Sequence, residues 1–331
     1  MVELKRICAV LLLGCLLLTS CRTAEPAERD FFAMDTLMHV KIWGSAEAAD
    51  MVEQELFRLD GLLSVTDESS EISQLNFGQT EAVSEETASL LRSAVALSER
   101  TGGAFDPSVY PLVRLWGFTQ DAQQVPSQEE LQGALCSIGT QNIRFDGNRI
   151  LLENGAQLDL GGIAKGYAAE RCAALLQSAG VEAALLSLGG NVQTVGTKPD
   201  GTPWAIGIAD PNRPEQALAT LRFTGSLALV TSGGYQRYFE ENGVRYHHIL
   251  DPSTGLPARS GLDSVTILAD SGTTADALST ALFVTGLEKA AEFWRASDDF
   301  EAVFITDDGE IFATQGAAEL LDGAEFQVIA R

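Results

Sequence analysis

The run DLGGIAKGY, residues 159–167, combines residue types that suit a phosphate or pyrophosphate ligand. We predict that a short strand over 156–159 delivers the Asp159 carboxylate into a Gly-Gly turn, which opens onto a helix carrying Lys165. Glycines allow a close backbone approach or a positive φ, and helix-start N–H groups beside a lysine attract anionic oxygen. The run matches neither a Walker loop nor GxGxxG, so a tight strand-to-helix turn with a surface lysine is the alternative.

A second pair of residues, Asp276 and Thr280, could hold a hard cation. Their i, i+4 spacing places both side chains on one face of a predicted helix. A carboxylate and a hydroxyl stacked in this way make half of a Mg²⁺ site, because Mg²⁺ takes oxygen ligands and keeps waters or phosphate oxygens. The alternative is a helix cap, in which Thr273 caps, Asp276 occupies the N3 position and Thr280 bonds back to its own helix.

Histidines and a hydroxyl-rich run are further candidates. His247 and His248 are neighbours in a predicted strand and face opposite ways, so one could serve a phosphoryl site as base or donor. Residues 231–237 (TSGGYQR) offer hydroxyls, an aromatic ring and an arginine, or alternatively a helix start capped by Ser232. The chain has three histidines and no GxSxG motif, which argues against a hydrolase triad.

Hydrophobic periodicity predicts the elements that position these residues. Strands are expected over 31–43, 142–145, 149–152, 183–187, 204–209, 217–223, 226–231, 262–269, 301–305 and 310–313. Helices are expected over 46–63, 71–76, 85–99, 127–136, 163–179, 273–285 and 287–296. Strands that mostly form hairpins, with helices between them, indicate an α+β fold with a mixed or antiparallel sheet.

Composition and charge narrow the function classes. The 331 residues are 45% hydrophobic and 21% charged, which is an ordinary globular composition. A formal net charge of -24 argues against binding to nucleic acid or anionic lipid. An anionic ligand must therefore be held by local groups. The chain has no CxxC motif, which argues against structural zinc; Cys172 is expected to be a buried free thiol, although pairing with Cys136 stays open.

The N-terminus predicts export. Basic residues and an apolar stretch over 7–18 precede the small residues Thr19-Ser20, which resembles a bacterial lipobox ending at Cys21. We expect a signal peptide over 1–20, a tether over 21–30 and one domain over 31–331. Lipidation of Cys21 would anchor the protein to the outer face of a bacterial cytoplasmic membrane, or on its periplasmic side. The alternative is an ordinary secretory signal with an incidental cysteine.

Taken in order, the motifs resemble the ApbE family of FAD:protein FMN transferases, from about Phe31 to the C-terminus. The matching segments are AMDT at 33–36, SEISQLN at 70–76, GAFDP at 103–107, PLVRLWGF at 111–118, DLGGIAKGYA at 159–168, LGGN at 188–191, TSGGYQR at 231–237, HHILDPSTGLP at 247–257 and ADALSTA at 275–281. The resemblance implies an ApbE-like, T-fold-related α+β fold with mixed or antiparallel sheets and packed helices.

The resemblance also implies a reaction and its residues. A Ser or Thr hydroxyl of an acceptor protein would attack the FMN-side phosphorus of FAD in the presence of Mg²⁺, and AMP would leave. The implied metal ligands are the main-chain carbonyl of Gly162 and the side chains of Asp276 and Thr280. Lys165 would face the pyrophosphate, and His248 would steer or deprotonate the hydroxyl. The implied catalytic residues are thus His248, Asp276 and Lys165, and the implied FAD contacts are Met34, Ala104, Phe105, Asp106, Asp159, Lys165 and His248.

Two positions depart from the family pattern. Asp35 stands where many members have glycine, and Thr66 stands where many have an aromatic residue. The resemblance suggests an extracytoplasmic electron-transfer subunit of the Rnf or Nqr type as the acceptor. Two other functions stay open: an FAD pyrophosphatase that gives FMN and AMP, and a flavin-binding lipoprotein without catalysis.

Overall fold

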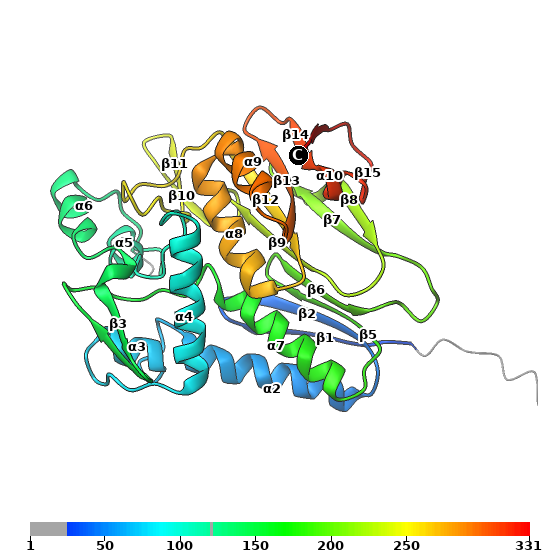
Figure 1. Ribbon diagram of the computed structural model, residues 1–331, viewed down its shortest axis with the longest axis horizontal. Helices are drawn as coiled ribbons and strands as arrows, with labels where there is room; N and C mark the ends of the chain where they lie inside the picture. The colour runs from blue at the N-terminus through cyan, green and yellow to red at the C-terminus, as the bar shows by residue number, and fades with distance from the viewer. Residues whose placement is uncertain (1–24, 120–121) are drawn as a thin grey trace, which may run out of the picture.

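The fold is built on one long mixed sheet. The computed structural model describes residues 25–119 and 122–331, so the expected signal peptide and Cys21 lie outside the described residues (Figure 1). Nine strands make the sheet, and all neighbours are antiparallel except β14 and β16. Their order is β1 (Ala27–Ala33), β2 (Thr36–Trp43), β5 (Ala183–Leu188), β6 (Asn191–Gly196), β9 (Ala228–Gly233), β12 (Leu262–Ala269), β13 (Phe300–Thr306), β14 (Ile311–Thr314) and β16 (Gln327–Ile329). The predicted α+β class is confirmed.

Three smaller sheets flank the long one. Their strands are β7 (Trp204–Asp210), β8 (Arg213–Phe223) and β15 (Leu321–Asp322); β3 (Ile143–Asp146) and β4 (Arg149–Leu152); and β10 (Tyr238–Glu241) and β11 (Val244–His247). The three-stranded sheet covers one face of the long sheet, because Trp204 and Leu221 share an apolar cluster with Leu268 of β12. Leu268 is therefore buried on that face, while Val265 and Ile267 are buried on the other.

The helices pack over the opposite face of the long sheet, beside its edge and, for the shortest one near the C-terminus, against the three-stranded sheet. They are α2 (Ala46–Leu63), α3 (Glu71–Asn76), α4 (Glu85–Arg100), α5 (Tyr110–Trp116), α6 (Gln128–Leu135), α7 (Ala164–Ser178), α8 (Gly272–Thr285), α9 (Leu287–Arg295) and α10 (Gln315–Ala318), with a 3₁₀ turn over Thr140–Asn142. Figure 1 shows α7 and α8 lying across the sheet, with α2 and α4 beside them. In the part of the chain that the structure describes, no helix is both long and apolar enough to span a bilayer.

Helices α7 and α8 touch backbone to backbone near their N-termini. A Cβ on Gly166 would lie 2.1 Å from the carbonyl oxygen of Gly272, so only glycine fits there. The contact brings the Gly166 N–H within 2.8 Å of Asp276 Oδ2, where it donates a hydrogen bond between residues 110 positions apart. This crossing fixes the two segments that the sequence singled out for chemistry.

Most predicted elements are confirmed to within a few residues, and the exceptions have local causes. Residues 156–159 are not a strand, since only Gln157 makes an isolated bridge, to Val109. The cap of α8 is Ser271 rather than Thr273. Ser232 lies in β9 and does not start a helix. The single strand expected over 31–43 is instead two antiparallel strands, β1 and β2, because the chain turns at Met34 and Asp35. The sheet also begins at Ala27, inside the expected tether.

The two described cysteines match one expectation. Cys172 is buried and Cys136 is exposed, and neither is bonded to another described cysteine. The predicted buried thiol at Cys172 is confirmed, because it lies in the apolar core beside α2, with Sγ 4.0 Å from the Val52 carbonyl oxygen.

The helix crossing yields a stability prediction. Gly166→Ala should lower the free energy of unfolding by about 1–3 kcal/mol, because its methyl group overlaps the α8 backbone. Gly61→Ala is the matched control: no atom lies within 4 Å of its new Cβ in α2, so it should gain up to ~1 kcal/mol. Urea unfolding followed by circular dichroism measures both. Equal stability of the Gly166→Ala variant and the wild type would contradict the crossing geometry.

Candidate active site

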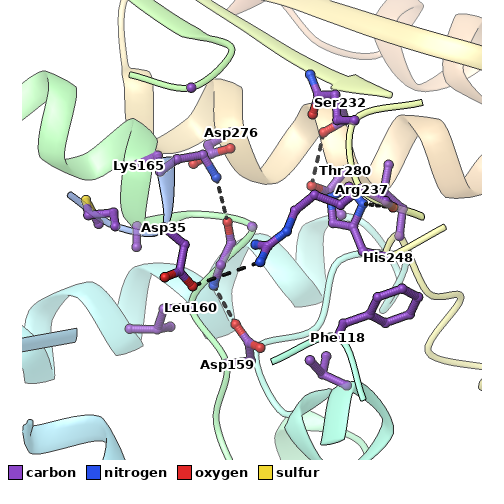
Figure 2. A pocket seen from close by; sticks show the side chains of 18 of the residues that line it. Asp35, Phe118, Asp159, Leu160, Lys165, Ser232, Arg237, His248, Asp276 and Thr280 are labelled. Atoms are coloured by element: carbon purple, nitrogen blue, oxygen red, sulfur yellow. Dashed lines mark hydrogen bonds and ion pairs between the residues drawn. The ribbon is translucent and has the colours of Figure 1, made fainter. Parts of the chain in front are cut away.

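A single cavity collects most of the residues that the sequence singled out. It encloses about 670 Å³, a volume typical of small-molecule sites. Its walls come from the β1–β2 turn, the start of α7, one face of α8 and the segments after β5, β9 and β11 (Figure 2). Every expected site residue lines it: Met34, Ala104, Phe105, Asp106, Asp159, Gly162, Lys165, His248, Asp276 and Thr280.

The start of α7 forms the cavity wall predicted from the DLGGIAKGY run. The Gly161 N–H donates to Asp159 Oδ1 at 2.7 Å, and the Lys165 ammonium lies 3.4 Å from the Gly161 carbonyl oxygen. Burial raises the pKa of Asp159, while the Gly161 N–H and the charge of Lys165 oppose that rise. Neither Gly161 nor Gly162 has a positive φ, so these glycines serve close approach rather than an unusual backbone conformation.

Asp276 and Thr280 face the same cavity from α8. Asp276 is only 4% exposed, and burial raises the pKa of its carboxyl, opposed by the charge of Lys165 and the Gly166 N–H. The Thr280 hydroxyl lies 3.4 Å from Ser232 Oγ on the neighbouring strand. The alternative interpretation of this pair as part of a helix cap at Thr273 is wrong, because the residue that caps α8 is Ser271.

The residues expected to hold Mg²⁺ lie together and fit a hard cation. A Cβ on Gly162 would be 3.3 Å from Thr280 Oγ1, so the glycine turn packs directly against α8. A buried carboxylate without a full counter-charge is costly, and a dication beside Asp276 would offset that cost. Within the described residues, no group of three or more His, Cys, Asp or Glu side chains gathers for a metal. This site would therefore rely on one carboxylate, a hydroxyl and a carbonyl, completed by water or ligand oxygens.

The two neighbouring histidines have separate environments, as their alternation predicted. His247 packs edge-on against Phe283 and lies 2.9 Å from the Ala258 carbonyl oxygen. His248 lines the cavity, with Nδ1 3.1 Å from the Arg237 carbonyl oxygen. A carbonyl only accepts, so Nδ1 carries the proton and Nε2 is the basic nitrogen. Burial lowers the pKa of His248 to about 3, which keeps the ring neutral at pH 7.

Comparisons with known proteins identify the family of this chain. The family model described as "ApbE family" matches residues 34–304. The chain belongs to the ApbE family. The FAD:protein FMN transferase of Treponema pallidum is 36% identical over 310 residues, covering 86% of this chain and 85% of that protein. The protein of the same name from Vibrio cholerae is 34% identical over 316 residues, covering 91% and 94%.

Solved ApbE structures share the fold. The ApbE protein of Thermotoga maritima has 38% sequence identity and a TM-score of 0.84, and the match covers 89% of this chain and 99% of that one. The flavin transferase ApbE from Vibrio cholerae has 31% identity and a TM-score of 0.79, with 90% and 99% covered. The expected ApbE-like fold is therefore confirmed.

The departure from the ApbE pattern at Asp35 has a structural cost. Met34 and Asp35 form the two-residue turn between β1 and β2, with φ values of 49° and 58°. Such a turn favours glycine or asparagine, because both central residues are left-handed. Two contacts hold it: the Met34 N–H donates to Asp60 Oδ2 at 2.9 Å, and the Asp35 carboxylate lies 4.0 Å from the Arg237 guanidinium.

Sequence reasoning gave several cavity residues no role. Ser232 and Arg237 belong to the TSGGYQR motif, for which the sequence also allowed a helix start in place of a binding role.

Asn191 ends the LGGN motif. It is 2% exposed, and its side chain lowers the pKa of Asp276. Thr66 is exposed at the cavity wall, where no aromatic ring stands. Asp106 accepts hydrogen bonds from the Ser108 N–H and hydroxyl, so one of its oxygens shapes the loop.

The low pKa of His248 predicts a pH-dependent stability. In the unfolded chain His248 is protonated below about pH 6.5, whereas in the folded protein it stays neutral down to about pH 3. The free energy of unfolding should therefore fall as the pH drops from 6.5 toward 3. His248→Asn should remove this contribution, whose slope is at most about 1.4 kcal/mol per pH unit. Urea titrations from pH 4.5 to 8 measure it, with His39→Asn on β2 as the control. Identical slopes in the wild type and His248→Asn would refute the buried neutral ring.

Proposed function

We propose that this chain transfers FMN from FAD to a Ser or Thr hydroxyl of an acceptor protein and releases AMP. The observation that carries the proposal is the meeting of Lys165, Asp276 and Thr280 across one cavity. Relatives named FAD:protein FMN transferase, aligned over most of the chain, support the same reaction. Phosphoryl transfer needs positioning and charge neutralisation more than covalent chemistry, and this set of groups supplies both.

Local positive groups compensate for the acidic chain. Lys165 and Arg237 both line the cavity, and so does Ala164 at the N-terminus of α7. Helix N-termini and an ammonium group favour phosphate oxygens. The diphosphate of FAD would therefore lie along this wall, while Phe105 and Met34 offer apolar surface to the rings.

The acidic wall would hold Mg²⁺ through Gly162, Asp276 and Thr280. A bound Mg²⁺ supplies Lewis-acid neutralisation of phosphate charge. Asp276 is prepared for that task because the Gly166 N–H occupies Oδ2 and fixes the orientation of the carboxylate. The charge of Lys165 acts on the same carboxylate and would also attract the diphosphate.

His248 would accept the proton of the attacking hydroxyl at Nε2. The hydroxyl oxygen forms a bond to the FMN-side phosphorus, the bond from that phosphorus to the bridging oxygen breaks, and AMP leaves with the bridging oxygen. A neutral imidazole is the form that can accept a proton, and the negative charge of a bound diphosphate would raise the pKa of His248 from the low value that burial gives it. The Nδ1–H held by the Arg237 carbonyl fixes the ring for that role.

The acceptor and the location complete the proposal. The acceptor would be an extracytoplasmic electron-transfer subunit of the Rnf or Nqr type carrying a Ser or Thr motif. Lipidation of Cys21 would place the enzyme at the membrane surface facing that subunit. The lipobox-like sequence before Cys21 is the support for this location.

Hydrolysis of FAD is the second candidate function. Water could replace the acceptor hydroxyl and give free FMN and AMP through the same groups. Thr66 favours this possibility, because a small side chain there leaves the cavity wall accessible to solvent. A flavin carrier without catalysis ranks third, since the buried Asp276 beside Thr280 would have no role in it.

The transfer itself is directly testable. Mature protein, FAD, Mg²⁺ and the extracytoplasmic domain of an Rnf- or Nqr-type subunit should give a yellow fluorescent band that survives denaturation, with one AMP released per FMN attached. Replacing the acceptor Ser or Thr by Ala is the control and should abolish the band. AMP and free FMN without a labelled band, across several acceptors, would favour the hydrolase; no AMP at all would favour the carrier.

The metal assignment makes a separate prediction. EDTA should abolish AMP release, and Thr280→Ala should raise the Mg²⁺ concentration for half-maximal rate by at least ~10-fold, because a ligand is lost. Thr285→Ala is the matched control, since Thr285 ends the same helix and bonds only to the Leu282 carbonyl. Thermal shifts with Mg²⁺ and FAD give a second readout. Unchanged Mg²⁺ dependence in Thr280→Ala would show that Thr280 is not a ligand.

A further inference from the structure

Helices α7 and α8 each hold a carboxylate of the other at their N-termini. Asp276 of α8 accepts from the Gly166 N–H of α7. In return, Glu170 of α7 accepts at Oε2 from three donors of the first turn of α8: Ser271 Oγ at 2.8 Å, Thr273 N at 3.1 Å and Thr273 Oγ1 at 2.9 Å. We call Gly166, Glu170, Ser271, Thr273 and Asp276 together the helix clasp.

We infer that Glu170 is a positioning residue for the reaction, an inference that rests on the proposed function. Glu170 does not line the cavity, so it acts through α8. The Ser271 hydroxyl that donates to Glu170 also accepts from the Thr274 N–H and thereby caps the helix. Glu170 thus sets where α8 starts relative to α7.

The location of α8 decides whether the chemical groups meet. Asp276 and Thr280 follow Thr273 within two turns of the same helix, while Lys165 lies one turn before Glu170 on α7. Gly166 and Gly272 are in backbone contact, so a rotation of α8 about that point would move Asp276 and Thr280 relative to Lys165. Glu170 and Asp276 each bond across this contact from their own helix, and the two sets of bonds together restrict such a rotation.

The electrostatics of the helix start support the same role. The first N–H groups of a helix have no partner within it and carry partial positive charge. Glu170 satisfies the Thr273 N–H and places a negative charge at that end. Without Glu170, the Thr273 N–H and two hydroxyls lose an acceptor, and the first turn of α8 loosens just ahead of Asp276.

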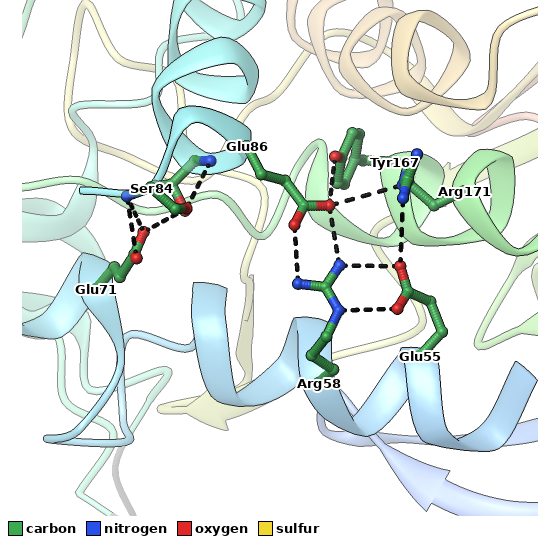
Figure 3. A network of polar contacts seen from close by, with 8 residues as sticks. Glu55, Arg58, Glu71, Ser84, Glu86, Tyr167 and Arg171 are labelled. Atoms are coloured by element: carbon green, nitrogen blue, oxygen red, sulfur yellow. Dashed lines mark hydrogen bonds and ion pairs between the residues drawn. The ribbon is translucent and has the colours of Figure 1, made fainter. Parts of the chain in front are cut away.

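The chain contains a matched control for this inference. Glu71 of α3 accepts from the Ser84 N–H at 3.0 Å and from Ser84 Oγ at 2.9 Å, at the start of α4 (Figure 3). Ser84 caps α4 as Ser271 caps α8. Neither Glu71 nor α4 lines the cavity. Removing Glu71 therefore reproduces the loss of a capping carboxylate at another helix and leaves the bonds at the start of α8 intact.

The experiment compares Glu170→Ala and Glu170→Gln with Glu71→Ala and Glu71→Gln in the full mature chain. Both Ala variants should lower the melting temperature. Only Glu170→Ala should raise the Mg²⁺ concentration for half-maximal AMP release and the KM for FAD, by about tenfold or more each. Glu170→Gln keeps an acceptor oxygen and should recover part of the loss.

Amide hydrogen exchange without FAD gives a readout independent of catalysis. Glu170→Ala should speed exchange in 272–277 by at least tenfold, and Glu71→Ala should leave that segment unchanged. Equal effects of the two Ala variants on KM, Mg²⁺ dependence and exchange would overturn the inference. A wild type that releases no AMP and labels no acceptor refutes the proposed function instead, and the exchange experiment still tests the clasp.

Discussion

The structure depends on keeping one carboxylate, Asp276, out of water next to a lysine. Burial alone would favour the neutral acid, so the surroundings must supply compensation. They do so with the Gly166 N–H, the Lys165 charge and the start of a helix, all on α7. This compensation requires α7 and α8 to approach at backbone distance, which only glycine at 166 and 272 permits. The contact between Gly166 and Gly272 therefore does more than pack the two helices, because it also brings the Asp276 carboxylate to the groups that stabilise its charge.

Helix α7 is held from its other side by charged groups. Glu86 of α4 accepts from the Tyr167 hydroxyl at 2.8 Å, and Arg58 of α2 bonds to both Glu86 and Glu55 (Figure 3). Isolated surface pairs contribute little to stability, but several charges in one network restrict geometry. Tyr167 lies two residues after Lys165, so this network fixes the same turn of α7 that faces the cavity. The candidate site is therefore positioned from both sides of one short segment.

Much of the fold was predictable from local signals, because periodicity and turn residues act over a few residues. The bounds of α3 and β12 came directly from the sequence, and the Asp276–Thr280 face followed from helical spacing. The cap of α8 was misplaced, since Ser271 and Thr273 are both good capping residues and only the position of Glu170 on another helix distinguishes them. The expected strand over 156–159 failed because alternation says nothing about whether a neighbouring strand exists.

The remaining features depend on contacts between segments far apart in the chain, and a single sequence gives no signal for those. Asp35 illustrates this. The sequence shows only that an aspartate stands where many family members have glycine. In the structure Asp35 has a positive φ, and its carboxylate lies 4.0 Å from the Arg237 guanidinium. A left-handed aspartate is tolerated at a modest cost that glycine would avoid. The pair is exposed, so its attraction offsets little of that cost. Arg237 in turn presents its backbone carbonyl to His248, and the turn at Asp35 thereby borders the residue that would receive the proton.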